Sequence, residues 1–150
     1  MIFVNLPTTD LERSKAFYTA LGCSINPLFT DDNAACIVWD DNTFFMVLIH
    51  GHFSQFTSKA IGDGHTTAQA IISFMVDSRD EVDEKITAGL TAGGSEPRDA
   101  QDYGFMYQRS IEDPDGNNLE FGYMEPQAAE DGPDAYVAEH GEGPDPVPGV

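Results

Sequence analysis

Asp113-Pro114-Asp115-Gly116-Asn117-Asn118-Leu119-Glu120-Phe121 is the stretch from which the fold is best predicted. Its proline fixes the φ angle of a turn, and its glycine and first asparagine tolerate the positive φ of a tight reversal. Leu119 and Phe121 then alternate with Glu120, which predicts a strand with its apolar side chains on one face and its carboxylate on the other. Glu120 is therefore either a solvated outer residue or a placed functional group.

A strand, a capped helix and a hairpin occur twice along the chain, as expected of an internal repeat. In the first copy we predict a strand at 2–6, a helix that ends at Gly22, and strands at 34–39 and 44–49. In the second copy we predict a strand at 70–76, a helix around Val82, Ile86 and Leu90, and strands at 103–111 and 118–123. Capping boxes mark both helix starts, Thr9 with Glu12 and Ser78 with Glu81.

The composition separates a folded part from a distinct tail. Residues 1–124 form the predicted domain, with module one at about 1–56, a linker at about 51–67 and module two at about 68–124. The acidic, Pro- and Gly-rich residues 125–150 are expected to be disordered or loosely draped.

The charge excludes some classes of partner. The chain has 26 acidic and seven basic residues, a formal net charge of −19. This argues against nucleic-acid binding and against docking on anionic membranes, and otherwise favours solubility. Cys23 and Cys36 match no zinc or redox spacing and are interpreted as buried, reduced thiols. No signal peptide or apolar span is predicted, so a cytoplasmic location is expected.

Two motifs resemble the vicinal oxygen chelate superfamily, which includes glyoxalase I, bleomycin-resistance proteins and extradiol dioxygenases. They are Asp10–Tyr18 with Leu21-Gly22, and Asp113–Asn117 with Glu120. The resemblance implies an α+β fold of two paired βαβββ modules, with a cupped mixed β-sheet and helices outside. It also implies a small-molecule site inside the cup and a homodimer, since homodimers are frequent in this superfamily.

The resemblance also implies where a metal ion would bind. Metal enzymes of the superfamily place four ligands on the first and last strands of the two modules. Glu120 matches one position, and the register assigns the other three to Phe3, Met46 and either Ile71 or Ile72. Phe and Ile cannot bind a metal, and the thioether of Met is a poor ligand for a hard divalent ion, so no cofactor is expected. A register shift of two residues would bring Asn5 into the site.

Candidate site residues follow from the same register. Glu120 is the candidate catalytic base, and the candidate ligand-binding residues are Asn5, Phe3, Met46, Tyr103, Tyr107 and Glu120. His50 and His52 could join Glu120 in an unconventional metal site, but we interpret them as surface or loop histidines.

Three functional hypotheses remain open. The first is a metal-independent protein of the glyoxalase/bleomycin-resistance type that binds a small molecule. The second is a divalent-metal-dependent lyase or isomerase, glyoxalase-like, that uses Glu120. The third is a dimeric interaction module whose acidic tail contacts a partner.

Overall fold

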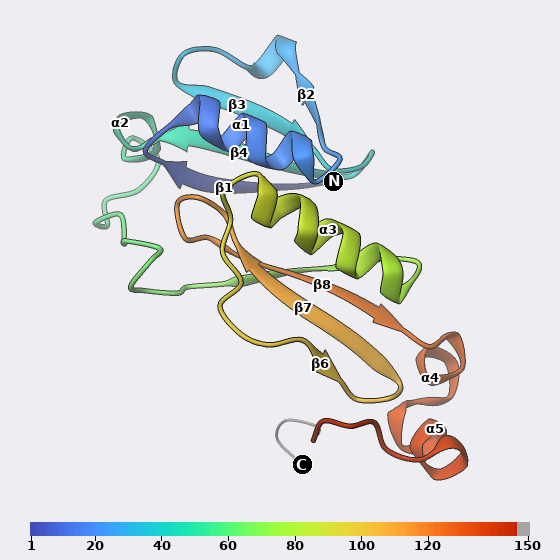
Figure 1. The fold of residues 1–150 in the computed structure, drawn as a ribbon. Helices are drawn as coiled ribbons and strands as arrows, with labels where there is room; N and C mark the ends of the chain where they lie inside the picture. The colour runs from blue at the N-terminus through green and yellow to red at the C-terminus, as the bar shows by residue number, and fades with distance from the viewer. Residues whose placement is uncertain (147–150) are drawn as a thin grey trace.

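Residues 1–146 are described by the computed structural model, which forms two four-stranded sheets with helices (Figure 1). The first sheet has the order β1-β4-β3-β2, with β1 at Ile2–Thr8, β2 at Ser24–Asn26, β3 at Ala34–Val38 and β4 at Thr43–Ile49. The second has the order β5-β8-β7-β6, with β5 at Ile71–Met75, β6 at Gln101–Asp102, β7 at Met106–Glu112 and β8 at Asn118–Met124. In each module the first strand pairs in parallel with the last, and the α+β fold of two βαβββ modules is confirmed.

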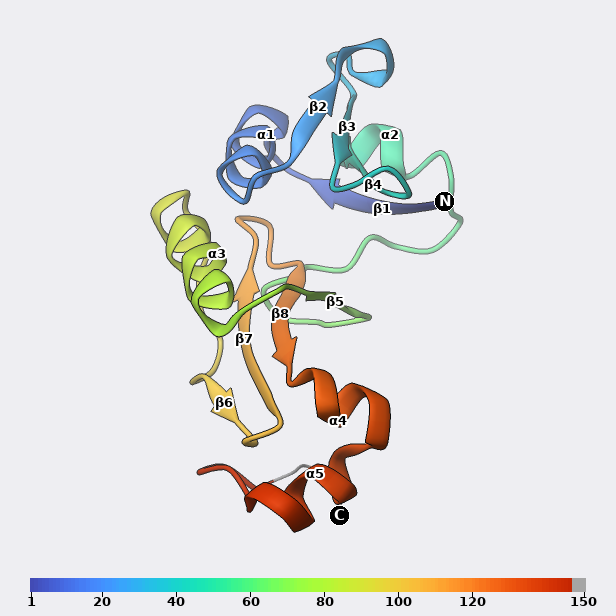
Figure 2. The ribbon, with the colours of Figure 1, turned by 90° about the vertical axis from the view of Figure 1, so that its right-hand side faces the viewer.

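One core joins the two modules. Helix α1 (Leu11–Ala20) contributes Phe17 and Tyr18, and helix α3 (Arg79–Thr91) contributes Val82 and Ile86, all fully buried. Figure 2 shows α1 and α3 on the same side of the molecule, while the connection from α2 (His50–Phe53) to β5 runs along the opposite side. The short α2 lies at the start of the predicted linker.

Aromatic side chains complete the contact between modules. The ring of Trp39, just after β3, stacks on Phe74 of β5 with a centroid separation of 4.0 Å. Phe45 of β4 also packs against Phe74, with ring centroids 5.7 Å apart. The helix-facing sides of both sheets are therefore buried together, and their other faces point away from this core.

The first helix is capped one residue later than predicted. Asp10, not Thr9, is the N-cap, and its carboxylate accepts the backbone N–H of Arg13 at 3.0 Å. Thr9 instead donates its hydroxyl to Asp115 in the second module. For α3 the predicted N-cap is confirmed, because the Ser78 hydroxyl accepts the backbone N–H of Glu81 at 3.1 Å. The Glu81 carboxylate accepts the backbone N–H of Asp77, not that of Ser78, so the second half of the capping box is absent.

The tail is the largest departure from the prediction within residues 1–146. It forms helices α4 (Pro126–Asp131) and α5 (Pro133–His140) instead of a loosely draped segment. Ala128, Tyr136 and Val137 pack on Tyr103 and Phe105, so apolar contact offsets the cost of ordering an acidic chain. Beyond α5, Gly143 donates its N–H to the Tyr103 carbonyl at 3.2 Å. The part of the tail at 147–150 lies outside the described residues.

None of the helices within residues 1–146 combines the length and apolarity that crossing a membrane requires.

Candidate functional site

Asp115, in the turn between β7 and β8, ties the second module to the start of α1. Its carboxylate accepts the hydroxyls of Thr8 and Thr9, each at 2.7 Å, and pairs with Arg13 at 2.9 Å. Burial alone would raise the pKa of Asp115, but these hydrogen bonds and the Arg13 charge outweigh it and hold the pKa below its ordinary value. The turn carboxylate is thus an ionised link between modules.

Asp113 makes a second, more deeply buried link. One carboxylate oxygen accepts the hydroxyl of Tyr18, from α1, at 2.8 Å, and the other accepts the backbone N–H groups of Asp115 and Asn117 at 2.9 Å. Burial raises the pKa of Asp113 despite these hydrogen bonds. Both acidic residues of the turn therefore serve the contact between modules, and the turn is held rigidly.

The β7–β8 turn also supports the end of the linker. We call residues 57–70 the strap. A Cβ added to Gly64 of the strap would lie 2.5 Å from the carbonyl oxygen of Asp115, and one added to Gly116 would lie 2.4 Å from the carbonyl carbon of Gly64. Gly116 also has φ of +83°. Two glycines at this crossing therefore let the strap backbone rest directly on the hairpin turn.

A cavity of about 650 Å³ lies between the strap, β1, α2 and the hairpin turn. We call it the strap cavity. Its apolar lining comes from both modules and includes Val4, Leu6, Phe53, Ile61 and Ile72. Its polar lining includes Asn5, His50, Lys59, Asp63, His65 and Asn118. A mostly apolar hollow with a few polar groups is the usual form of a small-molecule site.

Glu120 lies elsewhere, on the outer face of the second sheet. Its carboxylate accepts the Ser73 hydroxyl at 3.0 Å and forms an ion pair with Arg98. Arg109, on the neighbouring strand β7, projects from the other face of the sheet and pairs with Glu96 and Asp83 instead. Glu120 is therefore a satisfied carboxylate, and it does not line the strap cavity.

The strand register corrects the expected first-strand positions. Ser73, rather than Ile71 or Ile72, is the register partner of Glu120. In the first module Asn5, rather than Phe3, is the register partner of Met46. This matches the register shift of two residues considered for the first strand.

These residues do not form a donor set for a divalent ion. Among them only Glu120 carries a carboxylate, and that carboxylate is paired with a guanidinium, which would repel a cation. Within residues 1–146, no group of three His, Cys, Asp or Glu side chains is arranged to hold a metal. In particular, His50 and His52 do not gather around Glu120.

The structure separates the remaining predicted site residues. Phe3 stacks on Phe44 on the outer face of the first sheet, with ring centroids 4.8 Å apart. Tyr103 follows β6 and is buried under the tail helices, against Ala128, Tyr136 and Val137. Tyr107 faces α3 and donates its hydroxyl to Asp83 at 2.8 Å. Neither tyrosine lies on the Glu120 face, so the expectation of a shared aromatic cup was wrong for both.

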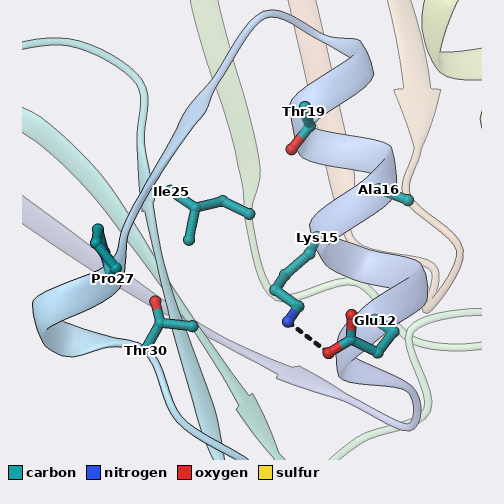
Figure 3. A pocket seen from close by; sticks show the side chains of 7 residues that line it. All are labelled: Glu12, Lys15, Ala16, Thr19, Ile25, Pro27 and Thr30. Carbon is teal, nitrogen blue, oxygen red and sulfur yellow. Dashed lines mark ion pairs between the residues drawn. The ribbon is translucent and has the colours of Figure 1, made fainter.

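A smaller hollow of about 470 Å³ lies between α1 and the segment around β2 (Figure 3). An ion pair in this hollow joins Lys15 and Glu12, and Figure 3 shows the two side chains reaching toward each other along α1. Ile25 and Pro27 line the opposite wall. The lysine of this hollow is therefore already paired with an acidic side chain.

Comparison with known proteins supports the fold assignment. Residues 1–39 match the family described as bleomycin resistance protein-like N-terminal. A hypothetical protein, SA1046, from S. aureus is 25% identical with a TM-score of 0.71, covering 82% of this chain and 92% of that one. A glyoxalase/bleomycin resistance protein/dioxygenase family enzyme from Burkholderia phytofirmans PsJN is 19% identical with a TM-score of 0.69, covering 82% and 97%.

A lactoylglutathione lyase from Agrobacterium tumefaciens is 20% identical with a TM-score of 0.61, covering 82% of this chain and 92% of that one. No curated protein matches the chain. The family match over residues 1–39 and the shared fold both support the resemblance to the vicinal oxygen chelate superfamily. At these identities the structural neighbours establish the fold and leave the activity to be argued from the site.

Proposed function

We propose that this protein binds a small molecule without a metal, as a member of the glyoxalase/bleomycin-resistance type, and that the ligand occupies the strap cavity. One observation carries the proposal: the cavity, of about 650 Å³, lies at the junction of both modules and is lined by apolar groups with a few polar ones. This volume is within the range of pockets for drug-sized ligands. A rigid floor, built by the hairpin turn, favours a pre-formed site.

The two alternatives find less support. A glyoxalase-like lyase would need a divalent ion, and the residues near Glu120 offer one carboxylate that is already paired with Arg98. An interaction module would need a tail that is free to reach a partner, whereas α4 and α5 are held on Tyr103 and Phe105 of the same chain by Ala128, Tyr136 and Val137. We retain small-molecule binding as the function.

A homodimer is part of the proposal. The outer faces of β1 and β5 carry exposed apolar side chains, with Phe3 50%, Ile71 63% and Met75 58% exposed. Two-fold pairing with a second copy would cover these residues on both chains at once. Light scattering after size exclusion should give twice the mass of one chain; a monomer at micromolar concentration would contradict this part.

Amide mapping tests the site directly. A fragment library is screened by ¹H–¹⁵N correlation spectra of the labelled chain. Binding fragments should shift the amides of residues 57–70 and of the turn at 115–118, because these segments form the walls of the cavity. Fragments that shift only the amides around Glu120, or no fragment that shifts the strap, would contradict the proposal.

A further inference from the structure

Lys59 differs from the other basic residues of this acidic chain. Arg13, Lys15, Arg79, Arg98 and Arg109 all form ion pairs with acidic side chains. Lys85 donates to the Leu21 carbonyl at 2.8 Å and lies over the Trp39 ring. For the Lys59 ammonium, no hydrogen bond or ion pair is found within residues 1–146, although the chain has 26 acidic side chains. Its one hydrogen bond in this region is made by the backbone N–H.

Lys59 lines the strap cavity together with the imidazole side chains of His50 and His65. Of the acidic groups in the cavity, Asp115 is saturated by its links to α1, and Asp63 accepts the backbone N–H of His65 at 3.0 Å through one carboxylate oxygen. Asp63 and Lys59 are both exposed, and no ion pair joins them within residues 1–146. Lys59 is therefore the full positive charge in the lining of this cavity that no acidic side chain pairs with.

Resting on the proposed function, we propose that the strap cavity selects an anionic ligand: a small molecule with an apolar body and one carboxylate, sulfonate or phosphate group that Lys59 binds. The apolar body contacts Val4, Leu6 and Ile72 on the module walls. A formal charge of −19 makes nonspecific attraction of anions weak, so a preference for an anion requires a local cation. A charge-assisted contact of this kind also orients the ligand.

Two dyes of nearly the same shape test the charge preference. 8-Anilino-1-naphthalenesulfonate carries a sulfonate, and N-phenyl-1-naphthylamine is its neutral counterpart. Fluorescence titration of the full chain should show saturable binding of both, with the sulfonate dye about tenfold tighter. Lys59→Gln should remove this preference, weakening the sulfonate dye about tenfold and leaving the neutral dye unchanged.

Lys15→Gln is the matched control, because Lys15 also lines a hollow but is already paired with Glu12. It should leave the affinity for both dyes unchanged. Equal affinity of the wild type for the two dyes, or an equal loss of the sulfonate dye in both lysine variants, would overturn the anion preference alone. Absence of saturable binding by either dye would count against the proposed function itself, so the two failures are distinguishable.

Discussion

Asp115 shows why an acidic turn residue need not belong to an active site. Its carboxylate joins β1, the start of α1 and the β7–β8 turn, and its side chain is only 7% exposed. Alternation along the strand indicates Glu120 as a candidate functional group. The carboxylates that hold the two modules together are those of Asp113 and Asp115, earlier in the same motif. The motif therefore specifies how the two modules are held together.

We predict that Asp115→Asn destabilises the fold at neutral pH. The amide cannot pair with Arg13 as an anion and presents one acceptor oxygen in place of two, so hydroxyl donors of Thr8 and Thr9 lose partners. The expected loss is about 1–3 kcal/mol in the free energy of unfolding, measured with urea by Trp39 fluorescence. Asp99→Asn, on an exposed loop, is the control and should change it by less than about 0.5 kcal/mol.

The wild type and Asp115→Asn should respond differently to acid. The folded-state pKa of Asp115 lies below the ordinary 3.8, so its stabilisation is complete above that pH and is lost as the pH falls through the lower, folded-state value. Asp113 has a raised pKa, so it acts in the opposite direction and favours the folded state as it takes up a proton. The difference in unfolding free energy between wild type and Asp115→Asn should therefore narrow between pH 5 and pH 3. An unchanged difference would refute the assigned role.

At the scale of elements, periodicity and capping predicted most of the fold. Apolar alternation and capping boxes are local signals, and they predicted one strand, one helix and a hairpin in each module. The complete βαβββ modules were implied by the family resemblance, because the short edge strands β2 and β6 carry too few residues for a pattern. The strap and the tail were not, since their order depends on distant surfaces: Gly64 on the turn at Gly116, and Ala128 on Tyr103. Lys59 was missed as a site residue for the same reason, because its lack of a partner is visible only after folding.

Docking of the strap on the turn gives a prediction at this scale. Gly64→Ala should push the strap away from the turn, because the new Cβ would meet the Asp115 carbonyl oxygen at 2.5 Å. Amide hydrogen exchange of residues 60–68 should become faster while that of β7 and β8 is retained. The control is Gly51→Ala, whose Cβ would meet nothing within 4 Å. Equal exchange in the two variants would show that the strap does not depend on this crossing.

At the scale of the molecule, the two modules share a core on their helix-facing sides and leave two other places for chemistry. One is the outer sheet face, where Glu120 is bonded to Ser73 and Arg98. The other is the strap cavity, which is lined by residues of both modules and of the linker. The repeat predicted that the modules would pair. It could not predict that the hollow would lie beneath the linker, because the linker has no periodic pattern.

The most direct measurement compares one variant at each place by titration with N-phenyl-1-naphthylamine. Ala60→Trp adds a large ring to the lining of the strap cavity, whereas Glu120→Gln removes the charge of the outer face. We predict that Ala60→Trp abolishes saturable binding and that Glu120→Gln, like the control Ala138→Trp on α5, binds as the wild type does. Binding that survives Ala60→Trp and is lost in Glu120→Gln would contradict the assignment of the ligand to the strap cavity.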